Sequence, residues 1–233
     1  MSELSKKKVI LAVDTADITI AKKYILQAQG LCYGIKLGLE FFVANGLIGL
    51  IDVQQKFSVP IFLDLKLHDI PNTVIKSIEA LHKNVDIDML TVHISGGQQM
   101  LSKIALLKQN NKMNTKILGV TLLTSLSEED IENIGIVGSS LADNVINMAQ
   151  IAYRSGLDGV VCSGYESKMI KNKFHDKLLT VVPGIRAKEL HGDQKRVMTP
   201  NMAVKNLADY LVVGREITSS TNMADAINNL FLL

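Results

Sequence analysis

Three charged residues lie within or just after one short apolar segment of the chain. Residues 61–65 are mostly apolar and follow Pro60, which predicts a buried parallel strand. The charged residues are Asp64, Lys66 and Asp69. Because side chains alternate along a strand, Asp64 and Lys66 are expected on one face at its end. Charged groups are costly to bury unless they are paired, so this segment indicates a structural ion pair or a catalytic cluster.

A lysine between two carboxylates could serve as an acid in catalysis. The negative charges of Asp64 and Asp69 would favour the charged ammonium form of Lys66 at neutral pH. An ammonium beside a reacting atom stabilises the negative charge that develops there. The spacing therefore predicts a site that stabilises an anion and then protonates it.

Strands and helices are predicted to alternate along the whole sequence. Short apolar segments predict eight strands, at residues 9–13, 31–37, 61–65, 88–92, 116–122, 159–162, 178–182 and 210–213. Helical periodicity predicts helices at 18–29, 41–57, 74–83, 141–155, 166–172 and 199–207, one ending at 108, one opening at 127–130 and one ending near 231. This alternation without a linker favours the α/β class and a (β/α)8 TIM barrel, as a single domain over residues 1–233. A doubly wound open sheet is the alternative, but residues 14–16 lack its glycine-rich first turn.

Local features of these elements can also be predicted. Asn72 or Thr73 is expected to cap the helix that starts near Val74. Gly46 and Gly49 are weak points in the helix at 41–57, because glycine disfavours helix interiors. The polar segment 127–130 is expected to open its helix through capping side chains.

Polar side chains fall where most of the predicted strands end. They are Asp14, Lys36, Asp64, Lys66, Thr124, Arg186 and Arg215. Barrel enzymes build their active sites at this face, from the loops that follow the strands. His93 also ends a strand, but a lone histidine there is more often a structural residue. We therefore expect the functional site at the carboxyl ends of the strands.

The charged segment is part of a longer motif. Residues 64–73 read Asp-x-Lys-x-x-Asp followed by Ile-Pro-Asn-Thr. This run resembles the signature of the orotidine 5′-phosphate decarboxylase family, and further matches extend in order from Val9 to about Thr218. The resemblance implies conversion of orotidine 5′-phosphate (OMP) to UMP and CO2 in pyrimidine biosynthesis. It implies no cofactor and no metal, because the lysine ammonium supplies the positive charge.

The resemblance also implies roles for the charged residues. Lys66 would deliver a proton to C6 of the pyrimidine as CO2 leaves, and Asp64 would lie near the substrate carboxylate. Asp69, Ile70 and Thr73 would contact the substrate as well. In relatives, this second aspartate and the threonine reach the ribose bound by the neighbouring subunit. By that likeness the chain would act as a homodimer, with Asp69 and Thr73 crossing the interface.

Other residues match the family's contacts to the rest of the substrate. They are Asp14 and Lys36 for the ribose, Thr124 or Ser125 for the base, and Gly214, Arg215, Arg186 and Gln194 for the phosphate. An N–H and a guanidinium at a helix start are suited to phosphate. Alternatively, Asp14 and Lys36 could form a structural salt bridge at the strand ends. Each arginine could likewise be an ordinary solvated charge on the surface.

Two other functions remain open at this point. Magnesium-dependent sugar-phosphate decarboxylases or aldolases of the same barrel group, such as 3-keto-gulonate-6-phosphate decarboxylase, share Asp-x-Lys-x-x-Asp but lack the Ile-Pro-Asn-Thr continuation. The second alternative is a non-catalytic nucleotide-binding module. The presence of all three charged residues, Asp64, Lys66 and Asp69, argues against it. The histidines show no metal-ligand spacing.

Composition sets further limits. Of the 233 residues, 47% are hydrophobic and 21% charged, which suits a large core. The net charge of +2, without a basic run between aromatics, argues against nucleic-acid binding. No apolar stretch is long enough for a membrane span, and the N-terminus does not resemble a signal peptide. Cys32 and Cys162 are expected as reduced thiols inside strands, as in a cytoplasmic protein.

Overall fold

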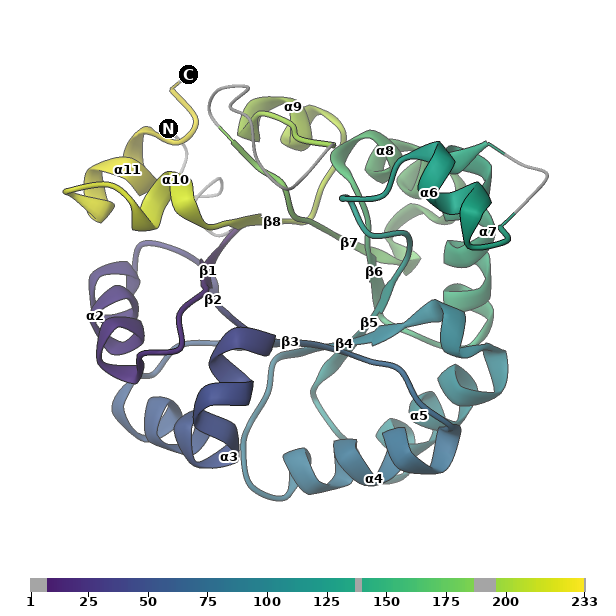
Figure 1. The fold of residues 1–233 in the computed structure, drawn as a ribbon, viewed down its shortest axis with the longest axis horizontal. Helices are drawn as coiled ribbons and strands as arrows, with labels where there is room; N and C mark the ends of the chain where they lie inside the picture. The colour runs from purple at the N-terminus through teal and green to yellow at the C-terminus, as the bar shows by residue number, and fades with distance from the viewer. Residues whose placement is uncertain (1–7, 137–139, 187–195, 233) are drawn as a thin grey trace.

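Eight parallel strands close into a barrel with helices around it (Figure 1). The structure is a computed structural model and describes residues 8–136, 140–186 and 196–232. The strands are β1 (Val9–Val13), β2 (Gly34–Gly38), β3 (Ile61–Leu67), β4 (Met89–His93), β5 (Lys116–Val120), β6 (Gly159–Val161), β7 (Leu179–Val182) and β8 (Tyr210–Val213). Each strand pairs in parallel with the next, and β8 closes the ring on β1. The predicted (β/α)8 barrel is confirmed.

Helices form the outer layer of Figure 1. They are α2 (Ile18–Ala28), α3 (Leu39–Lys56), α4 (Pro71–His82), α5 (Gln98–Asn110), α6 (Glu128–Asn133), α7 (Leu141–Arg154), α8 (Gly164–Phe174), α9 (Pro200–Lys205), α10 (Arg215–Thr218) and α11 (Met223–Asn229), with 3-10 turns at Ile94–Gly96 and His175–Lys177. Ser127 and Asp130 form the capping box predicted for the start of α6. Ser163 and Glu166 form a second one at α8. Each box satisfies N–H groups that the first helical turn leaves without partners.

Two apolar layers hold the barrel together. The larger includes Leu11, Ile35 and Leu63, whereas a separate cluster is formed by Ile10, Ala12, Phe62, Met89, Leu118, Val181 and Val212. Because side chains alternate along each strand, one layer lies under the helices and the other fills the barrel interior. This interior cluster fills the middle of the barrel, so a site must lie beyond it, towards an end of the barrel.

Strand β2 begins later than its apolar pattern predicts. The expected strand at 31–37 starts at Gly34, and Leu31 and Cys32 lie in the turn that precedes it. A Cβ atom on Gly34 would lie 2.6 Å from the carbonyl oxygen of Pro60. Only glycine therefore allows the backbone segments at Gly34 and Pro60 to approach this closely. The placement of Cys32 inside a strand was therefore wrong.

The two cysteines are both free, and neither lies within a strand. Burial raises the pKa of the Cys32 thiol to about 12. Cys162 follows the last residue of β6 and is fully buried, and burial raises the pKa of its thiol well above the usual value. Both groups therefore stay protonated and unreactive at neutral pH.

Helix α4 starts three residues before the predicted position. Pro71 is its first residue, and Ile70 stands at the cap position without a side-chain cap. Capping by Asn72 or Thr73 was wrong because both lie inside the first turn. Proline is suited to that position, since its fixed φ matches the helix and its missing N–H has no helical partner there.

Helix α3 is interrupted at Gly46, one of the two glycines predicted as weak points, whereas Gly49 is helical. Gly46 has φ of 58° and ψ of −157°, which lies outside the helical region. Glycine can adopt this backbone conformation because glycine has no Cβ atom. The chain is therefore kinked within α3, between its two helical parts.

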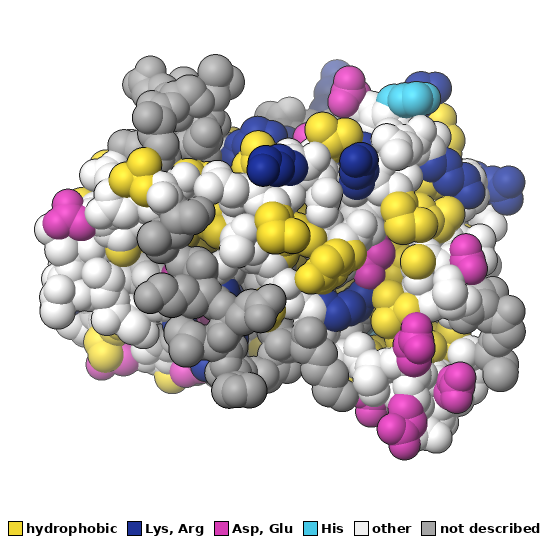
Figure 2. All heavy atoms as spheres, turned by 90° about the horizontal axis from the view of Figure 1, so that it is seen from above, with side chains coloured by type: hydrophobic (Ala, Val, Ile, Leu, Met, Phe, Trp, Pro, Cys, Tyr) yellow, Lys and Arg dark blue, Asp and Glu magenta, His cyan; other side chains and the backbone are white. Residues whose placement is uncertain are grey.

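The surface carries charges of both signs. Figure 2 shows acidic and basic side chains distributed over one face of the molecule, in keeping with a net charge of +2. Within the described residues, no helix has the length and the apolar character that crossing a membrane requires.

Candidate active site

A cavity of about 660 Å3 opens at the carboxyl ends of the barrel strands. Ala12, Phe62 and Val212 of the interior cluster lie in its wall and form its floor. The predicted site residues that line it are Asp14, Lys36, Asp64, Lys66, Thr124, Arg186, Gly214 and Arg215, together with Ser125. Six different strands therefore bring these residues into one cavity, through their carboxyl ends or the loops that follow, as the strand-end pattern predicted.

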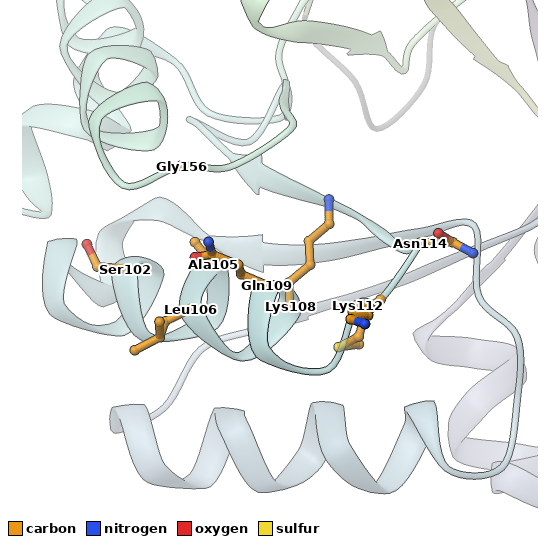
Figure 3. Close-up of a pocket in the computed structure, with 9 residues that line it drawn as sticks. Ser102, Ala105, Leu106, Lys108, Gln109, Lys112, Asn114 and Gly156 are labelled. Carbon is orange, nitrogen blue, oxygen red and sulfur yellow. The ribbon is translucent and has the colours of Figure 1, made fainter.

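A second hollow of similar size lies on the outside of the barrel along α5 (Figure 3). Its lining includes Ser102, Gln109 and Lys112, and no predicted site residue. Lys108 in its wall forms an ion pair with Asp158. The charge of Lys108 is therefore neutralised by a neighbour outside the hollow, whereas the barrel cavity gathers charged groups of both signs in its own wall.

Four charged side chains alternate in sign across the first three strands. Lys36 Nζ lies 2.9 Å from Oδ1 of Asp14 and 3.7 Å from Oδ2 of Asp64. Lys66 Nζ lies 2.8 Å from the same Oδ2 of Asp64. The side chains of Lys36 and Asp64 are each 12% exposed, and that of Asp14 is 57% exposed. The array is thus most shielded from water at its centre, where charges interact most strongly.

Asp64 is held in its ionised form. Burial by itself would raise the pKa of this carboxyl, but the positive charges of Lys36 and Lys66 and hydrogen bonds from Lys66 and Thr91 outweigh burial. The net result is a pKa below the usual value for aspartate. The carboxylate is therefore negative at neutral pH and keeps the lysine ammonium in place.

Strand β3 is irregular at the catalytic candidate. Leu63 pairs with Leu90 and Leu67 with Val92, so three residues of β3 bulge out opposite one of β4. Lys66 lies in this bulge with φ of 51°, a left-handed conformation that costs about 1–3 kcal/mol in a residue other than glycine. The predicted proximity of Lys66 to Asp64 is present, but it comes from this bulge and not from regular alternation.

Asp69 does not complete the expected pair of carboxylates within one chain. Its side chain is exposed and accepts a hydrogen bond from the N–H of Ile70 at 2.6 Å. Among the described residues, the one carboxylate paired with Lys66 is Asp64. Asp69, Ile70 and Thr73 lie outside the cavity wall, on the exposed loop and first turn of α4. Strand β3 ends at Leu67, so Asp69 lies two residues beyond it, in the connection to α4.

The loop that follows β7 is held at both of its described ends. The N–H of Arg186 donates to the carbonyl of Met198 at 3.0 Å, and the N–H of Met198 donates to the carbonyl of Gly184 at 3.1 Å. These bonds place Arg186 in the cavity wall. Gln194 lies outside the described residues.

Arg196 fixes a neighbouring part of the wall, and sequence reasoning missed it. Its guanidinium pairs with the buried Glu166 and donates to the carbonyls of Leu122 and Leu123 at 3.2 and 3.1 Å. These carbonyls directly precede Thr124. The partners lie about 30 and 70 residues away along the chain, so no local sequence signal reveals them.

His93 belongs to the surroundings of the charged array. Its ring centre lies 5.3 Å from that of His68. Burial lowers the pKa of His93, and the nearby His68 and Lys66 lower it further. A neutral histidine beside a second ring supports the structural role expected from the sequence.

Several proteins similar in sequence to this chain are named for one activity. Orotidine 5′-phosphate decarboxylase from Wolbachia pipientis subsp. Culex pipiens (strain wPip) is 43% identical over 218 residues, which cover 94% of both proteins. The protein of that name from Sphingopyxis alaskensis is 44% identical over 215 residues, covering 92% of this chain and 93% of its own length. These matches span almost the whole of each protein.

The structural comparison agrees with the sequence comparison. The crystal structure of orotidine 5′-phosphate decarboxylase from Lactobacillus acidophilus superimposes with a TM-score of 0.81 and 34% identity, over 96% of this chain and 97% of that one. A model of the family described as "Orotidine 5'-phosphate decarboxylase / HUMPS family" matches residues 7–230. On this combined likeness, the chain belongs to the orotidine 5′-phosphate decarboxylase / HUMPS family.

Proposed function

We propose that this chain converts OMP to UMP and CO2 in de novo pyrimidine biosynthesis. One observation carries the proposal: the Lys66 ammonium lies 2.8 Å from Asp64 in a cavity at the barrel mouth. The names of the relatives support it, since they specify this substrate and this reaction. The sugar-phosphate decarboxylase alternative and the non-catalytic alternative gain no support from these names.

The reaction needs a group that stabilises and then protonates a carbanion. The bond between C6 and the carboxylate breaks, the electron pair stays on C6, and CO2 leaves. The Lys66 ammonium stabilises this charge and donates a proton to C6, which yields UMP and a neutral amine that water reprotonates. Asp64 orients the ammonium, and its charge repels the substrate carboxylate until CO2 has left.

One charged pair is not enough for a difficult decarboxylation. Two unit charges about 4 Å apart interact by about 4 kcal/mol at an effective dielectric constant near 20. Enzymes commonly lower barriers by about 8–23 kcal/mol. The remainder must come from positioning and from binding energy at the parts of the substrate that do not react. Loss of the phosphate contacts should therefore reduce turnover as well as affinity.

The cavity wall offers groups for each of those parts. Asp14 and Lys36 are proposed to bind the ribose hydroxyls, because they lie beside Asp64 in the charged array. Arg186 and Arg215, with the N–H of Gly214, are proposed to bind the phosphate, and Gln194 to join them. Thr124 or Ser125 is proposed to bind the base, since both lie in the wall.

A homodimer would bring a second carboxylate to the site. Asp69 and Thr73 are exposed at the start of α4, and the neighbouring Ile70 is 66% exposed despite its apolar side chain. We propose that these residues meet the cavity of a second subunit, so that Asp69 flanks the partner's lysine. The proposal rests on the exposure of Asp69 and Thr73 outside the cavity of their own chain.

Two broader proposals accompany this function. We propose that the chain is a single barrel domain, because the strands of its one closed sheet extend from residue 9 to residue 213. We also propose that it acts in the cytoplasm, where two free thiols and a nucleotide substrate are both expected.

The experiment that tests this function is a spectrophotometric assay. Adding OMP to the purified chain in the presence of EDTA should abolish the orotate-type ultraviolet absorbance and produce UMP. Persistence of the absorbance would contradict the proposal. A strict requirement for Mg2+, with turnover of sugar phosphates, would favour the alternative enzyme.

A further inference from the structure

We propose that Thr91 is a positioning residue for the decarboxylation, which holds the Lys66 backbone and the Asp64 carboxylate in their reactive arrangement. This inference rests on the proposed function and goes beyond it, because Thr91 lies outside the motif and outside the cavity wall. It lies in the middle of β4 and is fully buried.

The Thr91 hydroxyl makes one bond to each of the two residues. Its Oγ1 accepts a hydrogen bond from the backbone N–H of Lys66 at 2.9 Å. The same hydroxyl donates to Oδ1 of Asp64 at 2.9 Å. A hydroxyl has one proton to donate, so these two contacts together fix its orientation.

The first bond acts where the backbone departs from the regular strand. In the bulge of β3, Lys66 adopts φ of 51°, and its N–H points to a side chain of the neighbouring strand and not to a strand carbonyl. A left-handed conformation in lysine persists only where the surroundings enforce it. Thr91 supplies that enforcement at the residue whose side chain must face the substrate.

The second hydrogen bond, from the Thr91 hydroxyl to Asp64, holds the carboxylate that pairs with the Lys66 ammonium. Asp64 is bound through Oδ1 to Thr91 and through Oδ2 to Lys66 Nζ, at 2.8 Å. A carboxylate held at both oxygens cannot rotate about its last bond. Removal of the hydroxyl would free Oδ1 and the Lys66 N–H together, so the ammonium would lose its fixed place relative to C6. Displacements of about 1 Å can reduce rates by about 100-fold.

The chain contains a matched control for this arrangement. Thr180 in β7 is also fully buried. Its hydroxyl accepts from the N–H of Asp209 and donates to an oxygen of the same aspartate, both at 3.3 Å, and it also accepts from the hydroxyl of Ser167 at 3.0 Å. It has no part in the cavity wall. Thr180→Val therefore removes a hydroxyl with the same kinds of partners, without touching the charged array.

The test compares steady-state kinetics of OMP decarboxylation for the intact chain and its variants. Thr91→Val should lower kcat by at least about tenfold while KM changes by less than about threefold, because the phosphate and ribose contacts stay in place. Thr91→Ser keeps the hydroxyl and should retain kcat within about threefold of the wild type. Thr180→Val should leave kcat within about twofold of the wild type, whatever its effect on thermal stability.

The inference is overturned if Thr91→Val keeps wild-type kcat, if Thr91→Ser loses as much as the valine variant, or if Thr180→Val loses as much as Thr91→Val. Should Thr91→Val fail to fold, Thr91→Cys replaces it. A thiol bonds more weakly than a hydroxyl, so its kcat should lie below that of the serine variant, and equal values would contradict the inference. A wild-type chain that does not turn over OMP would instead refute the proposed function, so the two failures are distinguishable.

Discussion

Lys66 Nζ and Asp64 Oδ2 lie 2.8 Å apart at the end of strand β3, although the Lys66 backbone has left the extended conformation. The contact thus exists because of a bulge in the strand and not because of its regular geometry. Bulges next to active sites commonly re-aim a side chain, and here the side chain is the proposed proton donor. Several measurements test how much of the function depends on this relationship.

The pH dependence of stability should report the state of Asp64. Its pKa is lower in the folded chain than the value of about 3.9 expected when unfolded, so the unfolded chain binds more protons in acid. The resulting stabilisation is present above about pH 4 and is lost as the pH falls through the folded-state pKa. The difference in free energy of unfolding between the wild type and Asp64→Asn, measured with urea, should therefore shrink from about pH 6 to about pH 3. A difference that stays constant would show that Asp64 is not ionised as described.

Arg215 should act on the phosphate and on no other part of the ligand. Arg215→Ala should weaken the binding of UMP by at least about tenfold, because charge-assisted bonds to phosphate are strong, and should leave uridine binding unchanged. Isothermal titration with both ligands would measure this. Lys168, exposed on α8 and not part of the cavity wall, provides a control in Lys168→Ala. Equal losses for UMP and uridine would remove Arg215 from the phosphate site.

Arg196 should matter for stability. Replacing it in Arg196→Met leaves the buried Glu166 charge without its partner, which should cost about 3–5 kcal/mol in the free energy of unfolding. Lys56→Met breaks the exposed pair with Asp52 and should cost at most about 1 kcal/mol. Urea unfolding of both variants would measure the contrast. Similar small losses would show that the Arg196 pair contributes little.

The proposed shared site can be tested by mixing inactive chains. Asp69→Ala and Lys66→Ala should each be nearly inactive as pure homodimers. After subunit exchange, half of the dimers are hybrids with one intact site of two, so about a quarter of wild-type activity should return. No recovery, in a mixture where exchange is demonstrated, would place Asp69 outside the partner's site.

The fold and most of the cavity wall could be predicted because their signals are local. Apolar segments at regular intervals specify the strands, and polar residues such as Asp14 and Lys36 mark where strands end. The closed barrel then brings these ends together, so the proximity of distant residues follows from topology alone.

The features that escaped prediction depend on contacts between distant segments. The left-handed backbone of Lys66 has no signal, because the turn chemistry of glycine or asparagine is absent there. Thr91 looks like an ordinary strand residue, and its two bonds reach across 25 and 27 positions. The spacing of the motif alone placed Asp69 beside Lys66, whereas its side chain is exposed, since spacing along the chain does not give the direction in which the loop turns.

The proposed chemistry requires the Lys66 ammonium to stabilise and protonate C6 of the substrate. The most direct test is the kcat of Lys66→Ala for OMP, measured beside the affinity of the same variant for UMP. Lys66→Ala should lose nearly all decarboxylation, with UMP still bound through its phosphate and ribose. Substantial turnover by a variant that has no amine at this position would contradict it.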